Sequence, residues 1–149
     1  MRLTRYTDYS LRTLMYLGLH RDRLCSINEI ATSYRISENH LTKVVHQLGR
    51  VGFIATSRGR GGGIKLARPP EQIGVGDVVR AMEEGFNLVD CRGCAVLPAC
   101  RLTGALAEAT AAFMAVLDRY NIGDFIQQGD TMRRLLAMME ASAAVEPAA

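Results

Sequence analysis

Three of the four cysteines in this 149-residue chain lie within ten residues of one another. They are Cys91, Cys94 and Cys100, and because Gly93 and Pro98 oppose helix formation between them, we expect a loop in which the three thiols converge. Three thiolates are one ligand short of a closed tetrahedral zinc site or a four-cysteine iron–sulphur cluster. A Cys-x2-Cys pair suits either centre, so the spacing leaves zinc, iron–sulphur and thiol redox chemistry open.

The composition favours one cytoplasmic domain. No apolar run approaches the length needed to cross a bilayer, and residues 1–5 lack the apolar core of a signal peptide. In the cytoplasm, clustered cysteines bind metal or sense redox state more often than they form stable disulfides. No base, nucleophile and acid are arranged around a predicted pocket, so we do not expect an enzyme.

Charge is distributed unevenly along the chain, whose net charge is +3. Residues 1–70 contain 12 Lys and Arg against 4 Asp and Glu, whereas residues 71–149 contain 6 against 11. A basic half joined to an acidic half indicates a polyanion-binding module followed by a segment with another task. A solvated basic face would have the same composition, so charge alone does not decide between the two.

The first predicted helix covers residues 7–21, with Thr7 as its N-cap. Asp8 lies in its first turn, where a carboxylate suits the helix dipole, and Arg12 follows at i+4. From the residues alone, Asp8 is expected to be an exposed acid that pairs with this arginine.

Two further helices are predicted before residue 51. Ser26 begins a capping box and a helix that extends to about Tyr34, and Ser37 caps another that extends to about Arg50. The latter has one apolar stripe and an otherwise polar surface. This pair of helices predicts a helix-turn-helix.

A basic hairpin follows the third helix. Residues 53–56 and 64–66 read as strands, and the glycine-rich tip between them carries Arg58 and Arg60. A phosphate-binding nucleotide loop needs a helix after its glycines, so the strand pattern excludes one here. The predicted fold is therefore mainly α: a winged helix-turn-helix with a two-stranded wing and a long C-terminal dimerisation helix.

In such a fold the third helix enters the major groove, while the wing reaches phosphates or the minor groove. The residues that we expect to contact DNA are Ser37, Asn39, His40, Thr42, Lys43, Arg58, Arg60 and Lys65. His40 and His46 face different directions on the helix, which argues against a shared metal.

The acidic half contains a predicted short helix over residues 77–83, the cysteine loop, and a long helix over residues 102–120. Leu106, Phe113 and Tyr120 recur every seven residues in the long helix, in a stripe too long for one small winged helix to cover. We therefore expect it to pair with its twin in a homodimer, with packing inside one subunit as the alternative.

After residue 126 the signal weakens. We expect a helix over residues 132–139 and disorder through Pro147. The chain then divides into a DNA-binding module (1–70), a linker helix and cysteine loop (71–101), a dimerisation helix (102–126) and a partly disordered tail (127–149).

Five short motifs occur in a recognisable order: TDYSLR (7–12), NHLTK (39–43), RGRGGGI (58–64), GDVVR (76–80) and PACRL (98–102). Each is weak alone. Together they resemble the nitric-oxide-sensing NsrR group of the Rrf-type winged-helix repressors, relatives of the iron–sulphur regulator IscR. The resemblance covers residues 1–126.

This resemblance implies a homodimer that binds palindromic operator DNA and carries an iron–sulphur cluster in each subunit, [4Fe-4S] or alternatively [2Fe-2S]. It implies that Cys91, Cys94 and Cys100 bind the cluster and that Asp8 of the partner subunit is the fourth ligand. IscR-type proteins use a histidine at the position of Thr103, so that ligand set is absent. Family members usually separate the first two cysteines more widely than here, which leaves the cluster type open.

We hypothesise that the cluster links the cysteine loop of one subunit to the first helix of the other. Nitric oxide would release Asp8, which would then pair with Arg12, and the recognition helices would lose their operator spacing. The alternative is an iron–sulphur, zinc or thiol redox regulator that is not specific for nitric oxide. Cys25, before the second helix, is expected to take no part.

Overall fold

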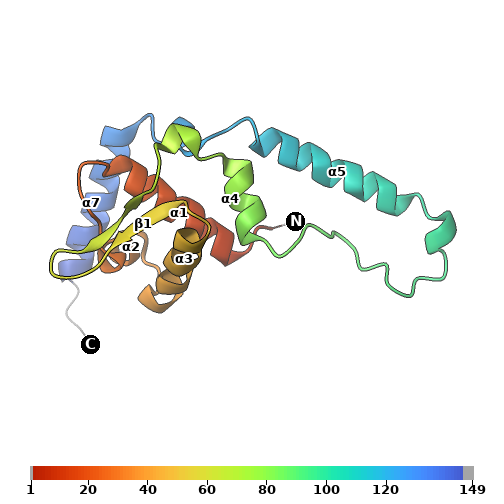
Figure 1. Cartoon of the computed structure of the whole chain (residues 1–149), viewed down its shortest axis with the longest axis horizontal. Helices are drawn as coiled ribbons and strands as arrows, with labels where there is room; N and C mark the ends of the chain where they lie inside the picture. The colour runs from red at the N-terminus through yellow and green to blue at the C-terminus, as the bar shows by residue number, and fades with distance from the viewer. Residues whose placement is uncertain (1, 146–149) are drawn as a thin grey trace.

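A body of helices and one hairpin contains both ends of the described chain, and one further helix, over residues 102–117, projects from it (Figure 1). The computed structural model describes residues 2–145. Its elements are α1 (Arg5–Leu19), α2 (Ile27–Tyr34), α3 (Glu38–Arg50), β1 (Ile54–Ser57), β2 (Gly63–Leu66), η1 (Pro70–Gln72), α4 (Val75–Met82), η2 (Leu97–Ala99), α5 (Leu102–Leu117), α6 (Ile122–Phe125) and α7 (Gly129–Val145). Within this range, no helix combines the length and apolar character that crossing a bilayer requires.

α1 is the central element of the body, where it packs against α3, α4, α6 and β2. Leu14 and Leu17 are buried in this core, and so are the polar residues Ser10 and Thr13. The two hydroxyls donate to the carbonyl oxygens of Tyr6 and Tyr9 at 2.8 and 2.7 Å, so their burial leaves no polar atom unpaired. Packing and these hydrogen bonds thus fix the buried face of the helix.

The start of α1 differs from the prediction. Thr4, rather than Thr7, is the N-cap, and its hydroxyl accepts a hydrogen bond from the Thr7 backbone N–H. Thr7 lies inside the helix and is fully buried. Thr4 and Thr7 are both suitable N-cap residues, so the sequence alone does not distinguish them. Packing buries Thr7 in the core and leaves Thr4 at the start of the helix.

The predicted helix-turn-helix is confirmed. Ser26 and Glu29 form the capping box of α2, and Arg35 ends that helix in the left-handed conformation (φ 52°). Ser37 occupies the N-cap position of α3 but makes no capping hydrogen bond through its side chain. The buried residues of α3 form one stripe, which consists of Leu41, Val44, Val45 and Leu48.

The wing is also confirmed, as an antiparallel pair in which Ile54 lies opposite Leu66 and Ser57 opposite Gly63. Gly59 and Gly61 at its tip have φ of 97° and 79°, which residues with a Cβ rarely adopt. The turn therefore needs these glycines, and they leave the two arginines between and beside them exposed.

The long predicted helix is present but ends at Leu117 instead of residue 120. It joins the body at that end, where Arg80 of α4 donates two hydrogen bonds to Asp118 at 2.7 and 2.6 Å. In this single chain Met114 is the one buried residue of α5, whereas Leu102 and Val116 are 57% and 43% exposed. Pairing of α5 with a second copy stays a prediction.

The C-terminal segment differs most from the prediction. α7 is longer than the expected helix over residues 132–139, and it packs against α2 instead of forming a loose tail. Contacts with residues more than a hundred positions away stabilise it, for example from Arg133 to the Leu19 carbonyl oxygen at 2.8 Å. Pro147, expected to be disordered, lies outside the described residues.

Candidate metal centre and DNA-binding surface

The cysteine loop lies beside the far part of α5, away from the helix-turn-helix (Figure 1). It is a series of tight turns: the Cys94 N–H donates to the Cys91 carbonyl, and the Cys100 N–H to that of Leu97, both at 3.2 Å. Gly93 has φ of 76°, which allows the first turn. Cys94 is exposed, Cys91 and Cys100 are half-buried, and all three thiols are free.

The loop alone does not bring the three thiols together as expected. Within residues 2–145 of this single chain, no three His, Cys, Asp or Glu side chains are placed so that they could hold one metal ion. In these turns the backbone N–H and carbonyl groups bond to near neighbours in the chain, and the cysteines are spread along the loop. Apart from its half-buried ends the loop is exposed, so little packing opposes a change in its shape.

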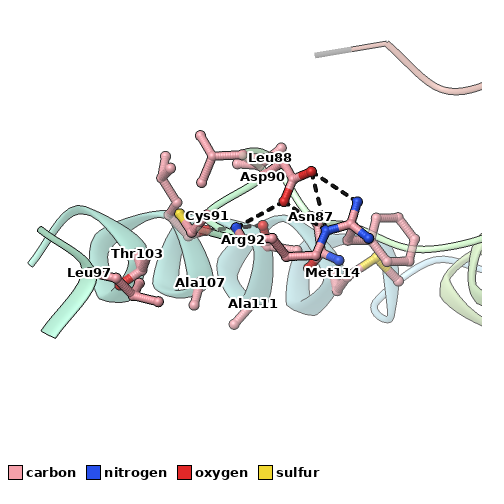
Figure 2. Close-up of a pocket in the computed structure, with 14 residues that line it drawn as sticks. Asn87, Leu88, Asp90, Cys91, Arg92, Leu97, Thr103, Ala107, Ala111 and Met114 are labelled. Atoms are coloured by element: carbon pink, nitrogen blue, oxygen red, sulfur yellow. Dashed lines mark hydrogen bonds and ion pairs between the residues drawn. The ribbon is translucent and has the colours of Figure 1, made fainter. Parts of the chain in front are cut away.

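An open groove of about 1000 Å³ separates the loop from α5 (Figure 2). Leu97, Ala107 and Met114 contribute apolar surface, and Cys91 lies among the lining residues. Asp90 and Arg92 form a charged pair at the loop, with 2.9 Å between Arg92 Nη2 and Asp90 Oδ2. Thiol donors beside an apolar surface suit a thiolate-bound metal centre, so the donor set fits iron–sulphur or zinc.

Asp8 lies on α1, outside this loop. Its carboxylate pairs with Arg12, with 2.8 Å both from Nε to Oδ1 and from Nη2 to Oδ2. The two side chains are 43% and 44% exposed. The guanidinium of Arg12 also lies over the ring of Tyr34 at 5.9 Å. Asp8 is therefore accessible from outside the subunit and has an alternative partner on its own helix.

The first turn of α1 is tied to two other elements, a feature that the sequence does not predict. Glu83, just after α4, accepts hydrogen bonds from the Thr4 backbone N–H at 2.8 Å and from the Thr7 hydroxyl at 2.5 Å. Burial of Glu83 acts to raise its pKa, but these hydrogen bonds outweigh it and lower the pKa. On the other side, the Tyr6 hydroxyl donates to the Lys43 carbonyl oxygen at 2.9 Å.

All eight residues expected to contact DNA are exposed. Five of them lie at or in the first half of α3, opposite its buried stripe, and the other three lie on the wing: Arg58 and Arg60 at its tip and Lys65 on β2. The structure thus leaves one basic surface on α3 and the wing free for a polyanion.

Cys25 has a different environment from the other cysteines. It is 1% exposed, and its backbone exchanges two hydrogen bonds with Ile64 of β2 at 2.9 and 2.8 Å. Burial raises the pKa of its thiol to about 12, so it is protonated at neutral pH. This geometry supports a structural role.

A recognition helix, a basic wing and a thiol-bearing loop define this class of protein: a winged-helix DNA-binding regulator with a candidate metal centre. The chain belongs to the Rrf2 family, described as iron-dependent transcriptional regulators, whose family model matches residues 3–128.

Two curated relatives share one name. The chain is 49% identical to the HTH-type transcriptional regulator NsrR of Shouchella clausii, over 91% of this chain and 95% of the relative. It is 46% identical to the NsrR regulator of Bacillus subtilis, over 94% and 100% of the two chains.

Solved structures show the same fold. IscR of T. potens superposes with a TM-score of 0.71 at 22% identity, covering 86% of this chain and 88% of that one. A transcriptional regulator from Listeria innocua gives 0.68 at 27% identity, with 85% and 87% covered. These likenesses support the winged-helix assignment.

Proposed function

We propose that this chain is a nitric-oxide-responsive repressor that binds palindromic operator DNA as a homodimer under the control of an iron–sulphur cluster. Cys91, Cys94 and Cys100 of one subunit, with Asp8 of the partner subunit, hold the cluster. The observation that carries the proposal is the position of three free thiols, none of them fully buried, immediately before α5, on which Leu102 and Val116 stay exposed in the single chain. The iron-dependent family supports the metal.

The residues fit such a group chemically. A bound iron–sulphur cluster supplies iron sites that can react with nitric oxide. Thiolates are the usual ligands of these clusters, and a carboxylate is a harder ligand that suits soft iron–sulphur iron less well. Of the four side chains that would hold the cluster, Asp8 would therefore bind it most weakly.

The energetics of Asp8 agree with an exchangeable role. Its pair with Arg12 is an exposed i,i+4 ion pair, which contributes only about 0.3–0.5 kcal/mol. Such a pair is too weak to keep the carboxylate from a metal ion, yet it gives Asp8 a defined partner after release. Arg12 is thus the switch residue of the proposal.

The dimer connects Asp8 with operator binding. Two recognition helices read a palindrome only when their separation matches the half-site spacing. A bond from the cysteine loop of one subunit to α1 of the other fixes the relative position of the two DNA-binding modules. Release of Asp8 relaxes that constraint, which weakens operator binding.

The test combines spectroscopy with DNA binding. Protein purified without oxygen should be coloured and contain iron and sulphide, and nitric oxide should weaken operator binding roughly 5- to 150-fold, the usual range for coupling between two sites. Asp8→Ala should bind operator weakly even before nitric oxide is added. Asp22→Ala is the matched control, because Asp22 is an exposed acid just beyond the end of the same helix.

Two results would contradict the proposal. If Asp8→Ala binds cluster and operator and responds to nitric oxide like the parent, the aspartate is not the link. If protein prepared without oxygen contains no iron and still binds operator tightly, the cluster does not control the affinity.

The second candidate is a zinc or thiol redox regulator that uses the same cysteines. The spacing of Cys91 and Cys94, with two residues between them, is narrower than is usual in the resembling family and suits zinc equally well, so it leaves this candidate open. A colourless protein that contains zinc, or whose operator affinity follows the thiol redox state without iron, would favour this candidate.

A further inference from the structure

Within residues 2–145, the side chain of Tyr6 makes the hydrogen bond that joins the first turn of α1 to the recognition helix α3. The same turn of α1 carries Asp8. Tyr6 lies two residues before Asp8, and its hydroxyl reaches the Lys43 carbonyl oxygen at 2.9 Å. A carbonyl oxygen has two lone pairs, so Lys43 can accept this bond in addition to its helical one. The acceptor lies in the middle of α3, whose exposed face we expect to read DNA.

The geometry of the helix makes Tyr6 and Asp8 move together. At 100° per residue, side chains two positions apart point in directions about 200° apart, so one can contact α3 while the other faces away from it. Both belong to one rigid turn. That turn is held to the end of α4 by Thr4 and Thr7, which both bond Glu83, and Thr7 is fully buried.

We propose that Tyr6 is a positioning residue that couples the state of Asp8 to the orientation of α3. The inference rests on the proposed function, because it assumes that Asp8 exchanges between a metal centre and Arg12. Coupling requires an element whose position both sites influence. The first turn of α1 is such an element, with Asp8 on one side and the Tyr6 bond to α3 on the other. This role requires no contact of Tyr6 with DNA or metal.

Tyr6→Phe removes the hydroxyl alone and leaves the ring. Tyr9→Phe is the matched control: Tyr9 is half-buried on the same helix, and its hydroxyl makes no hydrogen bond within residues 2–145. Each variant is purified without oxygen. Iron and sulphide content, operator affinity with and without cluster, and amide hydrogen exchange in α3 are measured for both and for the parent.

We expect Tyr6→Phe to contain as much cluster as the parent. The ratio of operator affinities with and without cluster should fall by roughly fivefold for each half-site, as expected for one lost hydrogen bond. Cluster loading should change the exchange rates of α3 amides in the parent and in Tyr9→Phe, and should leave them unchanged in Tyr6→Phe.

The outcomes separate this inference from the proposed function. If the parent responds to its cluster and Tyr6→Phe responds equally, the coupling does not pass through Tyr6. A Tyr6→Phe variant that no longer binds cluster would also overturn the inference, because its role would then lie in the metal centre. If the parent itself shows no cluster-dependent affinity, the proposed function fails and the coupling role fails with it.

Discussion

At the scale of single residues, environment divides the four cysteines into two kinds. Cys25 is buried and its backbone is hydrogen-bonded to the wing, whereas the three cysteines of the loop are half-buried or exposed. A thiolate is the metal ligand and the nucleophile, so a buried thiol with a raised pKa is inert. Only the accessible three are candidates for metal chemistry.

Replacing Cys25 with serine should therefore affect stability and not metal content. A hydroxyl buried in place of a thiol costs about 1–3 kcal/mol in the free energy of unfolding. Denaturant titration of the metal-free protein measures this. Cys94→Ser is the reciprocal variant: it should leave that free energy nearly unchanged, because Cys94 is exposed, and should abolish iron binding. Loss of iron on replacing Cys25 would contradict its assignment.

Charged residues on the wing lead to a prediction about salt. Arg58 is exposed at the tip, so Arg58→Ala removes one candidate phosphate contact per subunit. The slope of log affinity against log salt concentration should fall by about one per contact, or about two per dimer. Arg119→Ala, which removes an exposed arginine outside the basic surface, is the control. Equal slopes for Arg58→Ala and the parent would remove Arg58 from the DNA surface.

At the scale of elements, α7 belongs to the winged-helix body because of a small polar cluster. Glu140 of α7 accepts hydrogen bonds from the Tyr16 hydroxyl of α1 at 3.1 Å and from the Ser33 hydroxyl of α2. Arg35 adds a bond to Ser142 at 3.2 Å. The C-terminal helix thus reinforces α2, which in turn packs against the recognition helix.

Glu140→Ala should loosen α7 without unfolding the body. The variant loses the hydrogen bonds from Tyr16 and Ser33 to Glu140, but the Tyr16 hydroxyl can still donate to Glu29. The free energy of unfolding should therefore fall by about 1–2 kcal/mol. Hydrogen exchange should accelerate first in α7. Glu84→Ala, in the exposed loop after α4, should change neither quantity, and equal exchange in the two variants would show that Glu140 does not hold the helix.

At the scale of the whole molecule, α5 is the element that the single chain leaves incomplete. The helix is about 24 Å long at 1.5 Å per residue. It projects from the body (Figure 1). Its residues Leu102 and Val116 are exposed in the single chain. Exposed apolar residues along one helix are typical of a surface that a partner covers. The proposed function requires that partner to be a second copy.

Leu102→Glu tests this directly. The side chain is 57% exposed in one chain, so the subunit should still fold, but a buried charge in the pair should convert dimers to monomers. Sedimentation equilibrium gives the mass, and operator affinity should fall with the dimer. Leu135→Glu is the control, because Leu135 is 59% exposed on α7 and should leave the mass unchanged. A dimeric Leu102→Glu would place the interface elsewhere.

The sequence by itself determined the local structure and the class of protein. Capping residues, helical periodicity and glycine-rich turns predict α2, α3 and the wing because these signals depend on neighbouring residues. The spacing of the cysteines, together with Gly93 and Pro98, is also a local signal and predicts a thiol-rich loop. It does not predict where the three thiols lie in space.

Only the tertiary structure decided which distant residues meet. Thr4 and Thr7 bond Glu83, Tyr6 bonds Lys43, and α7 docks on α2 through Glu140. Each of these contacts joins positions far apart in the chain, where no local periodicity or cap carries a signal. Packing around α1 brings them together, and with them the turn that carries Asp8.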